Sequence, residues 1–139
     1  MRRLAVIAIW LWILSGNAQA AEMKLIVAIN GKNLHATLAD NPASRALYAQ
    51  MPFTVTMKNV YKREVCTGLP FNLPVSKLAG NNYAVGDIIY WPTRRSLAIL
   101  YRQNGERFRR QHLGHIESGT EIFGKAETID VSFIPITEP

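Results

Sequence analysis

Three histidines could support metal binding or acid–base chemistry, because imidazole titrates near neutral pH and ligates metals readily. His112 and His115 are three residues apart in a segment with strand character. Their side chains therefore point to opposite faces unless a bulge or turn intervenes. His35 lies on the polar face of an early strand and is predicted to be exposed. The spacing disfavours a metal site, and we expect no cofactor.

Cys66 is the residue that could act as a covalent nucleophile. It is the only cysteine in the sequence, which excludes an internal disulfide and a multi-cysteine metal site. Its neighbours do not lower a thiol pKa, so we predict a buried thiol that packs as a small apolar group, and a disulfide between two molecules stays open. Asp40 and Asp87 are explained as cap or turn residues. We assign no catalytic residue.

Aromatic residues provide the main indication of a binding site. Several fall in predicted strands, and although most should pack in the core, a barrel mouth lined by such rings could hold a proline-containing peptide or a small apolar ligand. Arg94, close to Trp91, could anchor an anion, but a solvated turn residue is the favoured interpretation. The candidate ligand-binding residues are Phe53, Met57, Trp91, Arg94, Tyr101 and Phe108.

The densest positive stretch covers residues 107–110, in a chain of formal charge +6 at pH 7. It could bind phosphate or an acidic surface. A solvated strand edge carries such charges as protection against edge-to-edge pairing, and we favour that interpretation. We expect no nucleic-acid partner for a chain with an export signal.

Most of the sequence alternates with the period of two that is typical of half-buried strands. Residues 24–29 and 34–38 flank Asn30-Gly31, a strong hairpin signal. A helix is predicted after Asn41, which can cap it, with Pro42 at its first position and Pro52 beyond its end. Further strands are predicted at residues 53–57, 62–67, 88–91, 96–101, 112–116 and 129–133, with an irregular loop at 71–85 and a helical turn at 119–124.

Seven or eight short strands with one inserted helix indicate a mainly β barrel or sandwich. Strands at this density leave exposed edges unless the sheet closes. We therefore predict a small closed β-barrel of about eight strands, with one clear helix and a second short one at 119–124.

The first twenty residues have the pattern of a secretory signal peptide. Arg2 and Arg3 precede an apolar run, and Ala18-Gln19-Ala20 offers a cleavage site. A retained anchor is disfavoured because crossing a bilayer takes about 20 apolar residues. We expect residues 1–20 to be removed and residues 21–139 to form a single periplasmic or secreted domain without a stable membrane anchor.

Several short segments in the mature region carry a family resemblance. They are Asp40-Asn41, Met51-Pro52-Phe53-Thr54, Gly86-Asp87-Ile88, Tyr90-Trp91-Pro92, residues 97–101 and Leu113-Gly114-His115-Ile116. In order and spacing the chain resembles the bacterial cyclophilin-like fold proteins, from about residue 24 to residue 133. The resemblance implies an eight-stranded closed barrel flanked by a helix at one end.

The resemblance also implies what catalysis would require. Cyclophilins isomerise peptidyl-prolyl bonds with an arginine that donates toward the prolyl nitrogen and an apolar pocket for the ring. Their signature, Arg beside Phe-His and then Phe-Met-x-Gln with a glycine pair, is missing from this sequence. Phe53, Met57 and Arg63 have suitable types without matching spacing, so no catalytic residue is carried over.

We therefore expect an exported cyclophilin-like domain that binds an extended peptide or a small molecule without catalysis. Two alternatives stay open: a divergent peptidyl-prolyl cis/trans isomerase, and a structural or interaction subunit of the cell envelope. The sequence does not decide the oligomeric state.

Overall fold

The computed structural model describes residues 22–137. The predicted signal peptide, residues 1–20, lies outside this part of the chain. Within residues 22–137, no helix is both long enough and apolar enough to cross a membrane.

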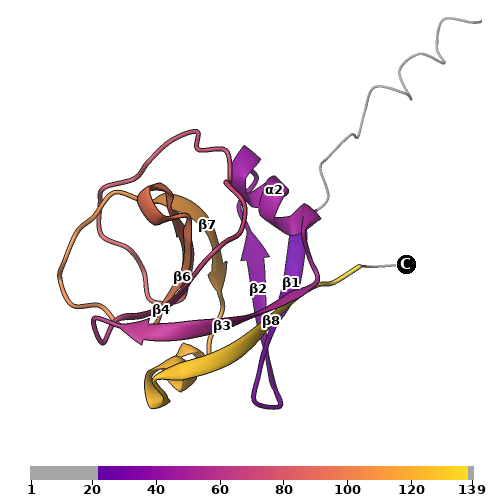
Figure 1. Ribbon diagram of the computed structural model, residues 1–139, viewed down its shortest axis with the longest axis vertical. Coiled ribbons are helices and arrows are strands. Elements are labelled where there is room, and N and C mark those ends of the chain that lie inside the picture. Colours follow the sequence, from indigo (N-terminus) through magenta and orange to yellow (C-terminus); the bar gives the residue numbers. More distant parts are fainter. Residues whose placement is uncertain (1–21, 138–139) are drawn as a thin grey trace, which may run out of the picture.

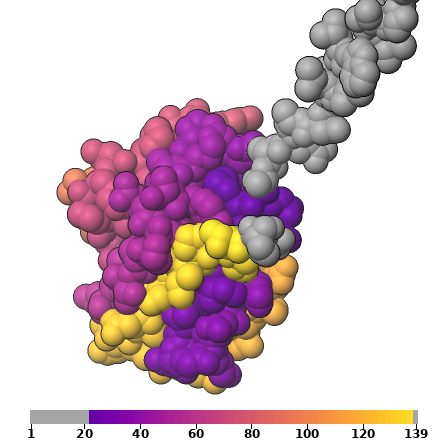
Figure 2. Space-filling model, turned by 90° about the vertical axis from the view of Figure 1, so that its right-hand side faces the viewer, coloured from indigo at the N-terminus to yellow at the C-terminus, as the bar shows by residue number. Residues whose placement is uncertain are grey.

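Eight antiparallel strands close into a barrel in the part of the chain that the structure describes (Figure 1). Around the wall they follow the order β1-β2-β7-β5-β6-β4-β3-β8, and β8 pairs with β1 to complete the ring. Their bounds are β1 Met23–Ile29, β2 Lys32–Leu38, β3 Phe53–Val60, β4 Glu64–Gly68, β5 Asp87–Trp91, β6 Ser96–Leu100, β7 Gln111–Ile116 and β8 Thr128–Pro135. Figure 2 shows β8, in yellow, beside segments from the first half of the chain. The predicted closed barrel is confirmed.

Two tight turns join neighbouring strands, and only the first has a sequence that is typical of a hairpin turn. Asn30 and Gly31 take φ angles of 48° and 80°, and β1 pairs with β2 along its whole length, as predicted. Tyr61 and Lys62 take φ angles of 58° and 49° and join β3 to β4. The prediction of a strand at residues 62–67 therefore begins too early, because this second turn uses residues that rarely adopt positive φ.

Helix α2, Pro42–Ala49, covers one end of the barrel (Figure 1). The Oδ1 atom of Asn41 accepts a hydrogen bond from the backbone N–H of Ser44 at 2.8 Å, which caps the helix as predicted. The Ser44 hydroxyl donates to the carbonyl of Leu113 in β7 at 2.7 Å. The same short segment therefore begins the helix and attaches it to the barrel.

Two short 3-10 helices complete the described elements. They are η2, Pro92–Arg94, and η3, Thr120–Lys125. The second corresponds to the helical turn predicted at residues 119–124. Two residues, Ala126 and Glu127, join it to β8.

The strands bury apolar residues on the inside of the barrel and, along β5 and β6, on the outside as well. Ile88 and Tyr90 belong to the interior core, whereas Ile89 between them points outward. A second cluster on the outer face contains Tyr83, Ile89, Ala98 and Leu100. Both faces of β5 and β6 are therefore covered, which accounts for their continuous apolar sequences.

Two long loops cover the outer cluster. One includes residues 71–85, which are irregular as predicted apart from a single β-bridge at Ala79, and the other runs from residue 101 to residue 110. The Tyr83 hydroxyl donates to the carbonyl of Arg102 at 2.6 Å. This bond ties the loops to each other over β5 and β6.

The basic stretch at residues 107–110 is not the predicted solvated strand edge: Arg107 and Arg109 are exposed, but Arg110 is buried. Arg110 is 3% exposed, and its Nη1 atom donates to the carbonyl of Asn81 at 2.6 Å. Its backbone pairs with Ala79 in both directions. The barrel in residues 22–137 is closed, so the stretch protects no sheet edge; Arg110 instead satisfies loop carbonyls.

Candidate functional site

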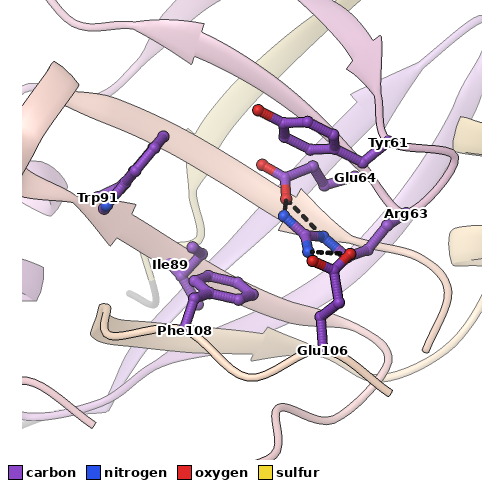
Figure 3. Close-up of a pocket in the computed structure, with 7 residues that line it drawn as sticks. All are labelled: Tyr61, Arg63, Glu64, Ile89, Trp91, Glu106 and Phe108. Carbon is purple, nitrogen blue, oxygen red and sulfur yellow. Dashed lines mark hydrogen bonds and ion pairs between the residues drawn. The ribbon is translucent and has the colours of Figure 1, made fainter. Parts of the chain in front are cut away.

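A cavity of about 240 Å³ lies on the outer face of the barrel wall. Its floor and walls come from the β3–β4 turn, the start of β4, the outward side of β5 and the loop that precedes β7 (Figure 3). The lining residues are Tyr61, Arg63, Glu64, Ile89, Trp91, Glu106 and Phe108. We call this cavity the Arg63 pocket.

Strand alternation explains why these side chains face outward. Val65 and Tyr90 belong to the barrel interior, so their neighbours Glu64, Ile89 and Trp91 point to the other side of the sheet. The interior is filled by its own core. The site therefore lies against the wall rather than at the barrel mouth that the aromatic residues of the sequence predict.

Arg63 and Glu64 form a buried ion pair at the base of the pocket. The Nε and Nη2 atoms of Arg63 donate to Oε1 of Glu64 at 2.8 and 2.5 Å. Each side chain is 8% exposed. The Nη1 atom of Arg63 reaches Oε1 of the exposed Glu106 at 3.4 Å. All three guanidinium nitrogens therefore donate to carboxylates.

Two aromatic rings lie close to the Arg63 guanidinium. The Cζ atom of Arg63 lies 4.9 Å from the ring centroid of Tyr61 and 4.6 Å from that of Phe108. Both distances are within the range of cation–π attraction. Two carboxylates and two aromatic rings therefore surround the cation, which restricts its movement toward a ligand.

Glu64 provides a polar atom in the pocket that no other group of the described residues engages. Oε1 accepts the bonds from Arg63, whereas Oε2 has no hydrogen-bond partner within residues 22–137 and points away from Arg63 in Figure 3. Burial raises the pKa of this carboxyl above its usual value, and the hydrogen bond and charge of Arg63 oppose the rise. Oε2 of Glu64 is therefore able to accept a hydrogen bond from a bound ligand.

The comparisons with known proteins agree with this architecture. The sequence model of the cyclophilin-like family matches residues 27–134. The chain belongs to the cyclophilin-like family. The solution structure of a hypothetical protein from Archaeoglobus fulgidus is similar, with 14% sequence identity, a TM-score of 0.66 and coverage of 86% of this chain and 98% of that one. At that identity the likeness supports the fold alone. No curated protein matches the chain.

The cyclophilin-like domain brings two of the six predicted ligand-binding residues into the Arg63 pocket. Trp91 is 36% exposed and forms one wall, and Phe108 forms another. Arg94 is exposed, with its Cζ atom 5.8 Å from the Trp91 ring centroid, and does not line the pocket. Tyr101 is 8% exposed and lines a second hollow that shares Tyr61 with the first.

The other two predicted residues pack in or against the interior of the cyclophilin-like domain. Met57 is fully buried in the core. Phe53 is half-buried, and its ring centroid lies 5.1 Å from that of Phe133. Both point to the inner side of β3. Neither lines the Arg63 pocket, so we do not retain them as ligand contacts.

Five pocket residues are not among the ligand contacts that the sequence predicts: Tyr61, Arg63, Glu64, Ile89 and Glu106. The outward position of Ile89 follows from alternation with Ile88 and Tyr90 once β5 is known to be covered on both faces. Glu106 reaches the pocket through a long loop, in which Asn104 donates to its Oε1 atom at 2.7 Å. The sequence contains no signal for that approach.

The remaining reactive groups of the cyclophilin-like domain lie elsewhere. A bulge in the β5–β7 pairing sets Ile89 opposite His112 and Asp87 opposite His115, which brings both histidines to the outer face. His115 Nδ1 and Asp87 Oδ1 are 3.0 Å apart. Residues 22–137 contain no group of three potential metal ligands. His35 is exposed, as predicted.

Cys66 is half-buried and packs against the outer cluster. Burial raises the pKa of its thiol, and the nearby Glu64 carboxylate raises it further. A raised pKa leaves less of the reactive thiolate at neutral pH, although the thiol is half-buried rather than buried as predicted.

Proposed function

We propose that this protein is an exported binding domain that holds an extended peptide or a small molecule in the Arg63 pocket and does not catalyse a reaction. The observation that carries the proposal is the state of Arg63. Its nitrogens donate to two carboxylates, and two aromatic rings lie within cation–π distance of its Cζ atom. An arginine held in this way is a fixed part of a binding surface.

The rest of the pocket has the character of a recognition site. Trp91, Phe108 and Ile89 supply apolar walls for a side chain or a flat group. Oε2 of Glu64 supplies one acceptor for a peptide N–H or an amine. The combination favours a ligand that presents an apolar group beside a hydrogen-bond donor.

A divergent peptidyl-prolyl isomerase is the second candidate. The observation in its favour is an arginine at the base of an apolar pocket, the pair of features that the family resemblance implies for catalysis. For this function Arg63 would have to release Glu64 or Glu106 in order to donate to a prolyl nitrogen.

Binding is tested with a neutral probe, acetyl-Gln-Ala-Phe-Ala-Gln-amide, and the chain from Ala21 onward, which contains every strand of the closed barrel. Calorimetry should detect binding, and Trp91→Ala should weaken it about tenfold or more, because a partly exposed tryptophan in a pocket is a frequent hot spot. Ile134→Ala is the matched control, since Ile134 is 40% exposed on β8 and lies outside the pocket. Equal affinity for wild type and Trp91→Ala would refute this site.

Catalysis is tested with a tetrapeptide anilide that contains a Phe–Pro bond. We expect isomerisation at the uncatalysed rate. Acceleration that Arg63→Lys abolishes would establish the isomerase instead, because lysine keeps the charge but loses the planar set of donors.

Export is part of the same proposal. It is supported by the arginine pair, the apolar run and Ala18-Gln19-Ala20 in the first twenty residues. Mass spectrometry of the protein recovered from the periplasm or medium should give a chain that begins at Ala21. Recovery of the full-length chain from the membrane fraction would support the retained anchor.

A further inference from the structure

A second hollow adjoins the Arg63 pocket and differs from it in charge. Its residues come from the end of β3, the β3–β4 turn, the segment after β6, the end of η3 and the link between η3 and β8. They are Asn59, Tyr61, Lys62, Tyr101, Arg102, Gly124, Lys125, Ala126 and Glu127. We call this site the basic hollow.

Internal hydrogen bonds fix the floor of the basic hollow. The Tyr101 hydroxyl donates to Oδ1 of Asn59 at 2.6 Å, and Nδ2 of Asn59 donates to the carbonyls of Phe123 and Ala126 at 3.0 and 3.1 Å. A Cβ atom at Gly124 would lie 3.0 Å from Cε1 of Tyr101. Glycine therefore keeps the floor open above the tyrosine ring, and the floor is ordered before any ligand arrives.

Three cations and one carboxylate surround this floor. Lys62, Arg102 and Lys125 are exposed, and none of them forms an ion pair within residues 22–137. Glu127 is the single acidic residue that lines the hollow. In the Arg63 pocket, by contrast, two carboxylates face one arginine. The two hollows thus carry opposite net charge.

Tyr61 lines both hollows and is 64% exposed. The backbone joins them as well, because the N–H groups of Tyr101 and Arg102 both donate to the carbonyl of Arg63, at 2.9 and 3.2 Å. A chain that leaves the Arg63 pocket across Tyr61 therefore arrives beside the three cations.

We infer that the basic hollow is a carboxylate subsite, and that the ligand of the Arg63 pocket is an acidic peptide whose apolar side chain and carboxylate occupy the two hollows together. The apolar group contacts Trp91 and Phe108. The carboxylate lies among Lys62, Arg102 and Lys125. This inference rests on the proposed function, since it names the ligand class of the same site.

Trp91 allows peptide binding to the Arg63 pocket to be followed by tryptophan fluorescence. Trp10 and Trp12 lie in the first twenty residues, so the chain from Ala21 onward has Trp91 as its only tryptophan, in the wall of the Arg63 pocket. Its fluorescence is followed while acetyl-Glu-Ala-Phe-Ala-Glu-amide or the neutral acetyl-Gln-Ala-Phe-Ala-Gln-amide is added. Acidic residues on both sides of the phenylalanine make the result independent of chain direction.

We expect the acidic peptide to bind about tenfold more tightly at low salt, with the advantage shrinking as salt screens the exposed charges. Lys125→Glu should remove that advantage. Lys32→Glu is the matched control, because it makes the same charge change at an exposed residue at the start of β2, outside the basic hollow, and should preserve the ratio of affinities.

Two failures have different meanings. Equal affinity for the two peptides, or equal loss of the ratio in Lys125→Glu and Lys32→Glu, would overturn the carboxylate subsite while the binding function stood. No change in Trp91 fluorescence with either peptide, together with no heat of binding, would overturn the binding function and the subsite with it.

Discussion

The pair of Arg63 and Glu64 combines a structural role with a place in the proposed site. Both side chains are 8% exposed, so each charge has lost most of its contact with water and depends on the other. Burial raises the pKa of Glu64 even with Arg63 beside it. The desolvation of this carboxylate is therefore only partly offset by its partner, and removal of the arginine should be costly.

Arg63→Met is expected to lower the free energy of unfolding by about 3–5 kcal/mol, because it leaves Glu64 buried without a cation. Urea denaturation followed by circular dichroism measures the change. The double variant Arg63→Met/Glu64→Leu should recover most of the loss, since it also removes the buried charge. A loss below about 1 kcal/mol in the single variant would place the pair among ordinary surface ion pairs.

His112 gives a second prediction at the level of one residue. Burial lowers its pKa below the ordinary value of 6.5, although the charge of Asp87 opposes the shift. Just below pH 6.5 the unfolded chain binds a proton that the folded protein does not, so the free energy of unfolding falls as the pH falls through this window.

His112→Gln should therefore flatten the decline of stability between about pH 7 and pH 5. Urea titrations at several pH values give the slope. His35→Gln is the control, because His35 is exposed on β2, and we expect it to keep the wild-type slope. An identical slope in His112→Gln and wild type would show that His112 does not contribute to this pH dependence.

Among the elements, β7 depends on close contact with β2. Their pairing is short and runs from Ala36↔Ile116 to Leu38↔Gly114. A Cβ atom at Gly114 would lie 2.5 Å from the carbonyl oxygen of Thr37 and 2.9 Å from Cα of Leu38. Because these neighbours include backbone atoms, no side-chain movement can make room.

Gly114→Ala is therefore expected to lower the free energy of unfolding by about 3 kcal/mol or more. Gly68→Ala is the matched control on β4, where a Cβ atom meets nothing within 4 Å, and it should change stability by less than about 0.5 kcal/mol. Thermal and urea unfolding compare the two. Similar stability for both variants would mean that β2 and β7 separate more easily than their contacts suggest.

Elements were predictable where the chain carries a local signal. Asn30-Gly31 and Asn41 each impose a backbone geometry by their own chemistry, and the structure confirms the predicted turn and helix cap. The Tyr61-Lys62 turn was missed because neither residue favours positive φ, so its cause lies in the pairing of β3 with β4. The Arg63 pocket is hard to predict from the sequence for the same reason, because this turn positions Tyr61 and Arg63.

The site residues that escaped prediction depend on long-range folding. Glu106 reaches Arg63 from a loop far along the chain. The sequence predicts a solvated edge at Arg110, whereas this residue is buried under the loop that contains Asn81. Period-two alternation distinguishes the two faces of a strand, but it does not show that loops cover the outer face of β5 and β6 and create a pocket there.

At the scale of the whole molecule, the wall of the barrel supports two apolar clusters with the same strands. Interior residues such as Ile88 and Tyr90 alternate along β5 with Ile89 of the outer cluster. The Arg63 pocket is built on that outer cluster. Unfolding of the interior core should therefore disrupt the pocket in the same transition. The pocket and the barrel should then have the same free energy of unfolding.

This coupling predicts a single cooperative unfolding transition for the chain from Ala21 onward. Trp91 fluorescence reports the outer pocket, and far-ultraviolet circular dichroism reports the strands of the barrel. The two probes should give the same urea midpoint and the same slope, as a two-state protein requires. A fluorescence midpoint at lower urea would show instead that the loops over β5 and β6 detach while the barrel is intact. The proposed ligand contacts at Trp91 and Phe108 would then belong to a surface that opens independently of the barrel.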